Sequence, residues 1–437
     1  KVWVMYAFMF ENENGSYIVP GKCAELDHYY GLTAFDFRCQ TVPNGTYKVY
    51  PIYRDMENGK WHYPSTNPKD GTPTIKVDVP VSYIYNAQDL VAYREQVEKG
   101  INGCAIIMND IDMSEVCGQA KGNWTPIGST AAPFKGRVIG NGHVISNLYI
   151  RNTKPYQGLF GAIGDGAYIT GITLDNTCNI RGGSYVGGIA GGSNIGGFVT
   201  ITNCGNEGTI YATQQNGGGI IGCSNGSHAT FIIKDCYNTG VISGNLENGA
   251  ISGWAGNNAT IENCYNTARV GGNDGKSSFV RSGSKIRLVN CYQRNTITPR
   301  QKGVEAIKIS VINSGELAYR LNENGTVDNW FQNLDTTQVA DEHPVVCKGH
   351  PWVYACTDST YSNTPKDLRI VSDGEVYEQE NDVYCSQVKY NRTFEQTEAW
   401  EPLFVPFPST VGEWGSTVHM AKIRGIHHYD DNSVLAC

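Results

Sequence analysis

The quartet Gly158-Leu-Phe-Gly161 opens a series of related segments that continues to Ile297. It recurs as Gly188-Ile-Ala-Gly191, Gly219-Ile-Ile-Gly222 and Ala250-Ile-Ser-Gly253, at steps of 30, 31 and 31 residues. A second motif lies between these quartets, as Ile201-Thr-Asn-Cys204-Gly-Asn206, Ile233-Lys-Asp-Cys236-Tyr-Asn238, Ile261-Glu-Asn-Cys264-Tyr-Asn266 and Leu288-Val-Asn-Cys291-Tyr-Gln293. Repeats of this length cannot bury an apolar face alone, so successive repeats must stack on one another. The segment therefore predicts a solenoid.

Aligning the repeats places side chains of one kind in columns. The first column holds Ile145, Ile169, Ile201, Ile233, Ile261 and Leu288, and the second holds Leu148, Ile172, Cys204, Cys236, Cys264 and Cys291. The third changes from Ile150 and Leu174 to Asn206, Asn238, Asn266 and Gln293, and the fourth holds Ile210, Ile242, Val270 and Ile297. Three short strands per repeat, joined at Gly and Asn turns, predict a parallel β-helix, which the usual crossover preference makes right-handed. Six coils at roughly 4.8 Å each would form a rod on the order of 30 Å.

Two of these columns predict how polar atoms and thiols are accommodated inside the solenoid. The asparagine column is expected to be a ladder of side-chain amides that hydrogen-bond between coils at a bend. The four cysteines of the second column are expected to be buried apolar thiols, because side chains stacked in successive coils need no bond. Three further pairings, which spacing alone leaves open, are Cys23 with Cys39, Cys104 with Cys117, and Cys347 with Cys356.

The pattern on either side of the repeats divides the chain into four parts. Residues 1–82 alternate apolar and polar positions in short runs, as in a small β-sandwich. Residues 83–300 comprise a capping helix, from the N-cap Asn86 to the glycine Gly100, and the β-helix itself. Residues 301–358 are expected to cap the other end, and residues 359–437 to form a second small β domain that could be incomplete. The expected fold class is all-β, a right-handed parallel β-helix solenoid flanked by small β-sandwich-like domains.

The composition favours an extracellular, β-rich protein. Charged residues make up 17% of the chain and glycines number 51, which suits strands and turns better than a helical cytosolic protein. The net charge of -8 argues against nucleic acid or an anionic membrane as partner. No apolar run reaches the roughly 18 residues of a membrane span, and no signal peptide opens the chain. Because the chain starts at Lys1 and not at an initiator Met, we expect a mature or trimmed form, with the signal and any lipid anchor absent.

The repeated Gly-Leu-Phe-Gly and Gly-Gly-Ile-Ala-Gly units, with Ile-x-Asn-Cys-x-Asn between them, resemble GLUG-motif repeats. The leader through Trp124–Gly128 and Gly140–Ile145, and the exit through Ser314–Asn322 and Trp330, resemble the segments on either side of such repeats. The resemblance covers roughly 83–358 and implies a cell-surface or secreted, adhesin-like protein. Such repeats also occur as non-catalytic parts of immunoglobulin A-specific metallopeptidases, and this chain contains no His-Glu-x-x-His zinc motif.

Three short motifs that would carry nucleotide or hydrolase chemistry are explained by the repeat. Gly217–Gly222 matches the dinucleotide fingerprint, but its sister repeats indicate a turn with no helix behind it to hold a phosphate. Gly222-Cys-Ser-Asn-Gly226 matches a nucleophile elbow, which requires a strained strand-to-helix turn, whereas this segment falls in a Gly/Asn loop. Gly271–Ser277 falls short of a phosphate loop, because Val270 occupies the first required glycine.

The first alternative function is that of a polysaccharide lyase or hydrolase, since parallel β-helices often carry such sites. These sites need acids clustered on adjacent coils, usually beside a basic residue. The outward column of Ser146, Thr170, Thr202, Lys234, Glu262 and Val289 offers one acid. We interpret Asp110, Asp112 and His143 as turn residues, and Asp235 as a replacement for Asn in its column. His427, His428, Asp430 and Asp431 could bind a metal, but an exposed polar tail is the expected state. We therefore expect no catalytic residue, metal or cofactor.

The outward column between the cysteines and the asparagines is the candidate binding site. It holds Tyr149, Thr173, Gly205, Tyr237, Tyr265 and Tyr292. Its last three members would stack about 4.8 Å apart on one face, and aromatic faces bind sugar rings. A structural ladder of rings along the sheet is the alternative, and we favour it. If a ligand is bound here, Tyr237, Tyr265 and Tyr292 are the residues expected to bind it.

These observations together predict a non-enzymatic surface protein that presents a rigid β-helix for glycan or host-protein binding. A polysaccharide-acting enzyme and a purely structural spacer are the two alternatives, and they differ in what each would do to a glycan.

Overall fold

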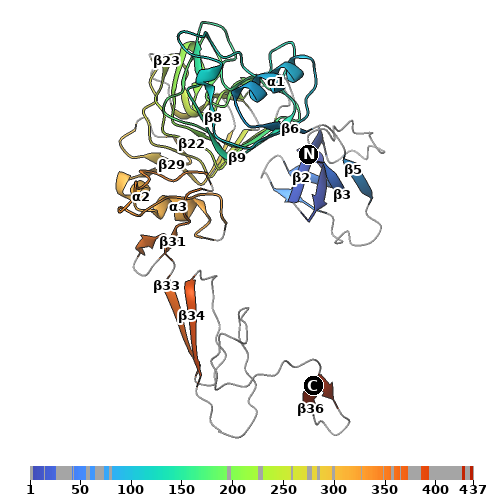
Figure 1. The fold of residues 1–437 in the computed structure, drawn as a ribbon, viewed down its shortest axis with the longest axis vertical. Helices are drawn as coiled ribbons and strands as arrows, with labels where there is room; N and C mark the ends of the chain where they lie inside the picture. Colours follow the sequence, from blue (N-terminus) through green and yellow to red (C-terminus); the bar gives the residue numbers. More distant parts are fainter. Residues whose placement is uncertain are drawn as a thin grey trace. The chain divides into compact units, whose positions relative to one another are not determined.

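The computed structural model is mostly β, with 50% of residues in strands and 9% in helices, and its main body is a β-solenoid of about six turns (Figure 1). The expected fold class is confirmed. The structure describes residues 3–13, 15–25, 42, 44–55, 60–63, 73–77, 81–193, 198–224, 230–256, 259–272, 278–282, 286–297, 301–325, 327–347, 349–355, 359–364, 366–372, 385–392, 426–428 and 434–436. The chain divides into two compact units, one of residues 1–366 with 382–386 and one of residues 367–381 with 387–437.

A helix covers the entrance to the solenoid, as expected. α1 (Ala87–Glu98) follows β6 (Val81–Ile84), and the Asn86 side chain accepts from two backbone N–H groups of the first turn at 2.9 and 3.0 Å. Gly100 adopts a φ of +83° just past the end of the helix. The apolar face of the helix packs into the core of the first coils through Leu90, Tyr93 and Val97.

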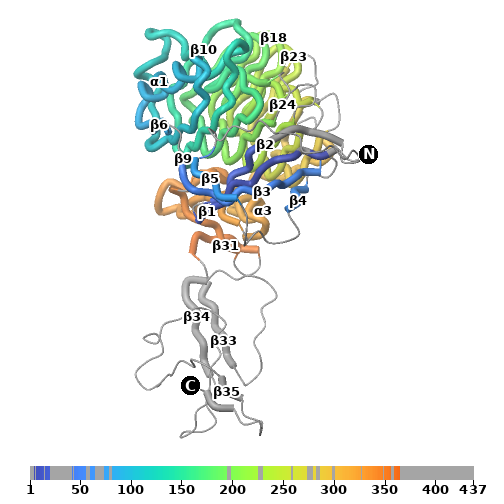
Figure 2. The backbone as a smooth tube through the Cα atoms, turned by 90° about the vertical axis from the view of Figure 1, so that its right-hand side faces the viewer, coloured from blue at the N-terminus to red at the C-terminus, as the bar shows by residue number. Residues whose placement is uncertain are grey.

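Parallel sheets form the walls of the solenoid, and its coils follow one another in chain order (Figure 2). In the described residues the first sheet has 14 strands: β6, β7 (Cys104–Ile107), β8 (Ile111–Asp112), β9 (Arg137–Ser146), β12 (Tyr168–Leu174), β16 (Phe198–Thr202), β17 (Gly205–Asn206), β21 (Thr230–Lys234), β22 (Tyr237–Asn238), β25 (Ala259–Glu262), β26 (Tyr265–Asn266), β28 (Ile286–Val289), β29 (Cys291–Arg294) and β30 (Val304–Ile307). The second sheet has seven: β11 (Phe160–Ala162), β14 (Val186–Gly187), β15 (Ala190–Ser193), β19 (Gly217–Gly218), β20 (Ile221–Ser224), β24 (Gly249–Ala255) and β27 (Ser278–Ser282). The third has four: β10 (Tyr149–Arg151), β13 (Asn179–Gly182), β18 (Thr209–Gln215) and β23 (Ile242–Leu246).

Within each coil, a bend in the left-handed backbone region divides the two strands that the coil contributes to the 14-stranded sheet. Asn203, Asp235, Asn263 and Asn290 have φ values of +51°, +52°, +50° and +51°. Asn and Asp tolerate this region better than other residues with a side chain. The bend therefore accounts for the Asn or Asp that precedes each cysteine of the repeated motif.

The expected asparagine ladder is present. Asn206 Nδ2 donates to Asn238 Oδ1 at 2.8 Å, and Asn238 Nδ2 donates to Asn266 Oδ1 at 2.9 Å. Each amide also donates to the backbone carbonyl two residues ahead of it, at 2.9 to 3.1 Å. Because all three side chains are fully buried, these bonds satisfy polar atoms that water cannot reach.

The quartet glycines are required by the close approach of neighbouring chain segments. A Cβ added at Gly219 would lie 2.4 Å from Asn238 Oδ1, and one added at Gly222 would lie 2.4 Å from the backbone nitrogen of Val186 in the preceding coil. Separations this short exclude a side chain. Gly217–Gly222 is therefore part of the repeat, with strands β19 and β20 on either side of its bend.

The alignment expected for the first coil is wrong. β9 pairs Ile145 with Leu174 and not with Ile169. The register shifts across the bend at Asn141–Gly142, where both residues have positive φ and three residues of β9 lie opposite one residue of β12. Strands that differ by a bulge lose their one-to-one pairing, so the sequence spacing misplaces this coil by part of a turn.

The same correction moves Ile150 into the fourth column. Ile150 pairs with Ile180, which pairs with Ile210 and through it with Ile242. All four side chains are fully buried, so the residues that follow them point away from the core.

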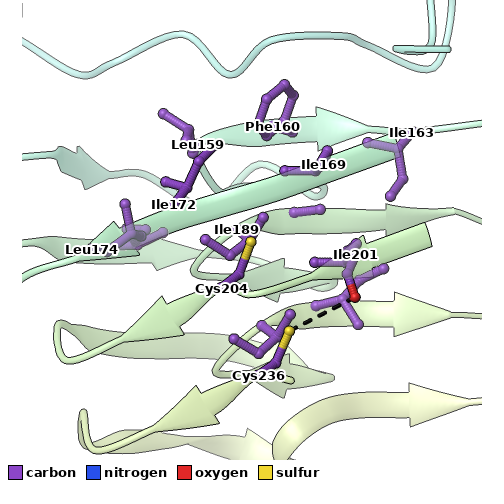
Figure 3. Close-up of a cluster of buried hydrophobic side chains, with 14 of the residues drawn as sticks. Leu159, Phe160, Ile163, Ile169, Ile172, Leu174, Ile189, Ile201, Cys204 and Cys236 are labelled. Atoms are coloured by element: carbon purple, nitrogen blue, oxygen red, sulfur yellow. Dashed lines mark hydrogen bonds between the residues drawn. The ribbon is translucent and has the colours of Figure 1, made fainter. Parts of the chain in front are cut away.

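The cysteine column lies inside the solenoid, as expected. Cys204, Cys236, Cys264 and Cys291 are free and buried, and the first two lie among isoleucines of successive coils (Figure 3). Each of the four thiols donates to the carbonyl two residues before it, at 3.1 to 3.3 Å.

The other candidate cysteine pairs have different outcomes. Cys104 and Cys117 are both free and buried, so this pair does not form. The pairs that involve Cys39 and Cys356 include residues outside the described part of the chain.

The segment after the last coil folds into a cap. Two short helices, α2 (Ile309–Asn313) and α3 (Glu316–Leu321), are followed by one antiparallel bridge between Phe331 and Val345, where a strand pair was expected. Asn322 holds this turn, because its Oδ1 accepts from the backbone N–H of Trp330 at 2.9 Å and its Nδ2 donates to the carbonyl of Trp330 at 2.8 Å. A short hairpin of β31 (Tyr354–Ala355) and β32 (Tyr361–Ser362) follows.

The described residues before the solenoid form one five-stranded antiparallel sheet of β1 (Trp3–Asn12), β2 (Gly15–Glu25), β3 (Gly45–Asp55), β4 (Trp61–His62) and β5 (Thr74–Val77). Apolar side chains pack on it in two clusters, one around Phe10 and Tyr47 and one around Met9 and Ile52. The second sheet that a sandwich requires stays a prediction.

In the C-terminal part, the described strands form two pairs, β33 (Lys366–Ser372) with β34 (Cys385–Arg392) and β35 (Ile426–His428) with β36 (Val434–Ala436). The expected strand at Trp400–Phe407 and the acids Asp430 and Asp431 lie outside the described residues.

Candidate functional site

The predicted tyrosine row is in register on consecutive coils. Tyr237 pairs with Tyr265, which pairs with Tyr292. The rings of Tyr237 and Tyr265 are parallel within 5° and their centroids are 5.4 Å apart. The expected stacking along the sheet is therefore present.

The row does not face solvent, so its rings form no open platform, and the arrangement is the structural ladder that we favoured over a binding site. Tyr237 and Tyr265 are 0% exposed and Tyr292 is 6% exposed. The cap folds back over the outer face of their strands, and Trp330 lies 5.4 Å from the Tyr265 ring and 6.1 Å from the Tyr237 ring. In this structure the row is a buried aromatic ladder that joins the solenoid to its cap.

Polar groups at the edge of this ladder satisfy the two phenols. Tyr237 donates from its hydroxyl to Glu207 Oε1 at 2.7 Å. The Tyr265 hydroxyl donates to the carbonyl of Pro344 and lies 2.9 Å from His343 Nδ1. Burial first, and the nearby carboxylate of Glu207 second, raise the pKa of both phenols well above the ordinary value. Both tyrosines therefore stay protonated and act as donors.

Asp235 is the acid most strongly altered by the cap. The residue is 2% exposed, and its carboxylate accepts from Trp330 Nε1 and Asn329 Nδ2, each at 3.3 Å. Burial raises the pKa of Asp235 to about 6, and the neighbouring Lys234 opposes that rise. A buried carboxyl with a raised pKa can mark a catalytic acid, but here it is enclosed by the cap and contacts structural donors.

The acids considered for catalysis do not gather. Glu262 forms an ion pair with Lys234 of the preceding coil at 3.1 Å, and these two are in register in the outward column. Asp110 Oδ1 lies 3.0 Å from His143 Nδ1, and Asp112 accepts from a backbone N–H at the start of a short 3₁₀ turn. Among the described residues, no three His, Cys, Asp or Glu side chains are grouped so as to hold a metal ion.

The described residues of the chance motifs form no site. Ser224 of the nucleophile-elbow match is fully buried, 3.1 Å from the Ser252 hydroxyl. Most of Gly271–Ser277 lies outside the described residues. A shallow hollow of about 330 Å³ lies beside the ladder, lined by Asn290, Cys291, Tyr292, Gly303, Val304 and Glu305.

A face of the four-stranded sheet carries an exposed row that sequence reasoning missed. Arg151 pairs with Arg181, and Arg181 pairs with Tyr211. We call these three residues the arginine row. Arg151 and Tyr211 are exposed and Arg181 is half-buried, and the guanidinium carbon of Arg181 lies 5.0 Å from the centre of the Tyr211 ring. The sequence signal for this row is the residue that follows each isoleucine of the fourth column. The misalignment of the first coil concealed it, because Ile150 was placed in the third column.

A second, partly exposed aromatic feature lies at the next bend of the same coils. Tyr156 and Tyr185 have φ values of +56° and +60°, and their ring centroids are 4.9 Å apart. Bulky residues rarely adopt this backbone region. The turn fits because a Cβ at Gly191 would lie 2.5 Å from the Tyr156 backbone, so only glycine can face it.

The chain is similar in sequence to known proteins over only a short segment. No known family model matches the chain. A protein of Evansella cellulosilytica, provisionally named a Gly-rich membrane protein, is 35% identical over 69 residues, which are 16% of this chain. This chain spans only 8% of that relative's length. Among the described residues, no helix is long and apolar enough to cross a membrane.

One solved structure resembles the chain in its fold. It is the crystal structure of a provisionally assigned immunoglobulin A1 protease from Bacteroides ovatus, with a TM-score of 0.42 and 18% sequence identity. The likeness covers 64% of this chain and 93% of that one. The resemblance to GLUG-motif repeats stays a prediction.

Proposed function

We propose that this chain is a non-enzymatic, adhesin-like surface protein whose solenoid binds glycans. The observation that carries the proposal is the outer face of the four-stranded sheet, where Tyr149, Arg151, Asn179, Arg181, Thr209 and Tyr211 alternate with buried side chains. Aromatic rings, amides and hydroxyls at fixed spacing are the groups that contact the faces and hydroxyls of sugar rings.

The solenoid holds such a face rigid. Backbone bonds between coils, the amide ladder through Asn238 and the isoleucine core set the position of every outward side chain. A rigid surface loses little conformational entropy when it binds an extended ligand. The same feature suits a module that must act under mechanical load at a cell surface.

The Tyr156–Tyr185 pair supports this interpretation. Both residues occupy a backbone region that costs a bulky residue on the order of 1–3 kcal/mol, whereas the next coil places Asn216 there, with a φ of +62°. Asparagine is the cheaper residue for this bend. Two tyrosines at a strained and partly exposed position lower stability, so a role in binding explains them better than a structural role does.

The enzymatic alternative has weaker support. A lyase or hydrolase needs a free acid or base beside its substrate, and Glu262 is paired with Lys234 while Asp235 is enclosed beneath Trp330. The spacer alternative predicts that no glycan binds at all.

A secreted or surface location is also part of the proposal. The buried thiols of the cysteine column would withstand an oxidising environment, because an inaccessible thiol with a raised pKa supplies little reactive thiolate. Host proteins would then be contacted through the glycans that they carry.

Binding of the full chain to a glycan array tests the proposal. We expect binding to a defined set of glycans, weakened by the double variant Tyr156→Ala, Tyr185→Ala and unchanged by Tyr83→Ala, which removes an exposed ring elsewhere. Binding to a glycoprotein that survives enzymatic deglycosylation would point to a protein partner instead. Release of reducing ends or unsaturated products from a polysaccharide panel would establish the enzyme alternative, and a silent array would favour the spacer.

A further inference from the structure

Two arginines occupy directly opposite positions on neighbouring coils. Arg151 and Arg181 are paired in register in a parallel sheet, which places their backbones about 4.8 Å apart. Ile150 and Ile180, one residue earlier, are fully buried, so alternation along the strand directs both arginine side chains outward. Like charges directly opposite one another destabilise a sheet.

Within the described part of the chain, no acid offsets that repulsion. Among the described residues, no carboxylate lies within ion-pair distance of either guanidinium. The other outward column of the solenoid shows the contrast, because there Lys234 faces Glu262 in register and the two form an ion pair at 3.1 Å. The protein pairs opposite charges on that face and leaves two cations together on this one, although its net charge is -8.

Tyr211 fixes one of these cations. The Arg181 guanidinium packs over the Tyr211 ring at 5.0 Å, a contact that orients the planar group and leaves its edge free to donate. The ring itself is 39% exposed. On the same face, Asn179 and Thr209 are paired with each other two residues earlier along these strands and offer groups that hydrogen-bond hydroxyls.

We propose that the arginine row binds the carboxylate of an acidic glycan, a uronic acid polymer in the simplest case. The inference rests on the proposed glycan-binding function and names its ligand class. A guanidinium edge matches a carboxylate with two parallel hydrogen bonds, and the exposed Tyr211 ring contacts the adjoining sugar. Binding relieves the repulsion between Arg151 and Arg181, because the anion places a negative charge beside both guanidinium groups.

Calorimetric titration of the full chain with an oligogalacturonate, and with the same oligosaccharide after carboxyl reduction, tests this. We expect the acidic form to bind, the reduced form to bind at least about tenfold more weakly, and affinity to fall as salt is raised. Arg181→Ala and Arg151→Ala should each weaken binding about tenfold or more. Arg181→Lys should also weaken it, since lysine keeps the charge but loses the fork.

Lys302→Ala is the matched control, because it removes an exposed charge at the other end of the solenoid and should bind as the unmodified chain does. Since the arginines are on the surface, circular dichroism should show each variant folded. Equal binding of the reduced oligosaccharide, tighter binding of a sulfated glycan, or unchanged binding by both alanine variants would overturn the inference. If no acidic glycan bound to the chain, the inference would also be overturned. Binding of the chain to neutral glycans on the array would nevertheless leave the proposed function intact.

Discussion

The indole Nε1 of Trp330 donates to Asp235 Oδ1 at 3.3 Å, across 95 residues of sequence. Both side chains are buried, one in the cap and one at the left-handed bend of a coil. This contact anchors the cap on the outer face of the solenoid. It also places a carboxyl where ionisation is costly, because an ionised group is poorly solvated in a buried site.

Replacing Asp235 by Asn should raise stability most at neutral pH. The pKa of Asp235 is raised from 3.8 to about 6, so the folded state holds the proton more tightly than the unfolded state. The stabilisation that this provides is complete below about pH 4 and is lost as pH rises through 6. The loss is on the order of 3 kcal/mol. Asn keeps an acceptor for Trp330 and occupies the same bend at Asn203 and Asn263.

Scanning calorimetry of the solenoid's unfolding transition measures this effect as the difference in stability between the variant and the unmodified chain. That difference should grow between pH 4 and pH 7.5. Asp112→Asn is the control with the opposite sign, since hydrogen bonds lower the pKa of Asp112. The stabilisation that the native Asp112 carboxylate provides is lost as pH falls, so this variant should be most destabilised at neutral pH. A difference for Asp235→Asn that is flat with pH would contradict the assignment.

Removing the Tyr265 ring should detach the cap. Tyr265→Ala opens a cavity between Tyr237 and Trp330, at a cost of about 3–5 kcal/mol. Tyr265→Phe keeps the packing and loses only the hydroxyl, at about 1 kcal/mol. Hydrogen exchange should become faster in the cap, residues 301–347, for the first variant and change little for the second.

Tyr211→Ala provides a comparison, since that ring is exposed and should contribute little to stability. Equal exchange in the cap for Tyr265→Ala and Tyr211→Ala would mean that the cap is held elsewhere.

Substitutions in the amide ladder should reduce stability by an amount that depends on their position in the ladder. Asn238→Leu leaves two neighbours short of a partner, the donor of Asn206 and the acceptor of Asn266, each at about 1–3 kcal/mol. Asn206→Leu should cost less, because Asn206 starts the ladder and Leu174 occupies the preceding position. Thermal midpoints of the two variants give the order, and a larger loss for Asn206→Leu would refute the ladder as the source.

The cysteine column should be inert to thiol reagents while the protein is folded. Cys236 and Cys291 are buried, and burial raises the pKa of both thiols well above the ordinary value. Cys347 is partly exposed and should be modified first. Labelling followed by mass spectrometry should reach the column only in denaturant, and rapid labelling of Cys236 in the native protein would show that the coils open.

The period of the sequence was sufficient for the solenoid, the amide ladder and the buried thiols. Each depends on residues in the same place of neighbouring coils, such as Asn206 and Asn238, and stacking brings those together wherever the repeat length is steady. The prediction failed where the spacing changed, at the Asn141–Gly142 bulge, since two extra residues in one strand are not visible without its partner.

Exposure of the outward columns was decided by the tertiary structure alone. Tyr265 and Tyr211 both point away from the solenoid core, yet Trp330 covers the first and leaves the second open. A repeat pattern determines which side of a strand a residue takes. Whether that side meets water depends on a segment distant in sequence, and the energy of that contact comes from packing between surfaces that no local spacing encodes. The repeats alone therefore determined the solenoid, and the packing of the cap decided which of its faces remain free to bind.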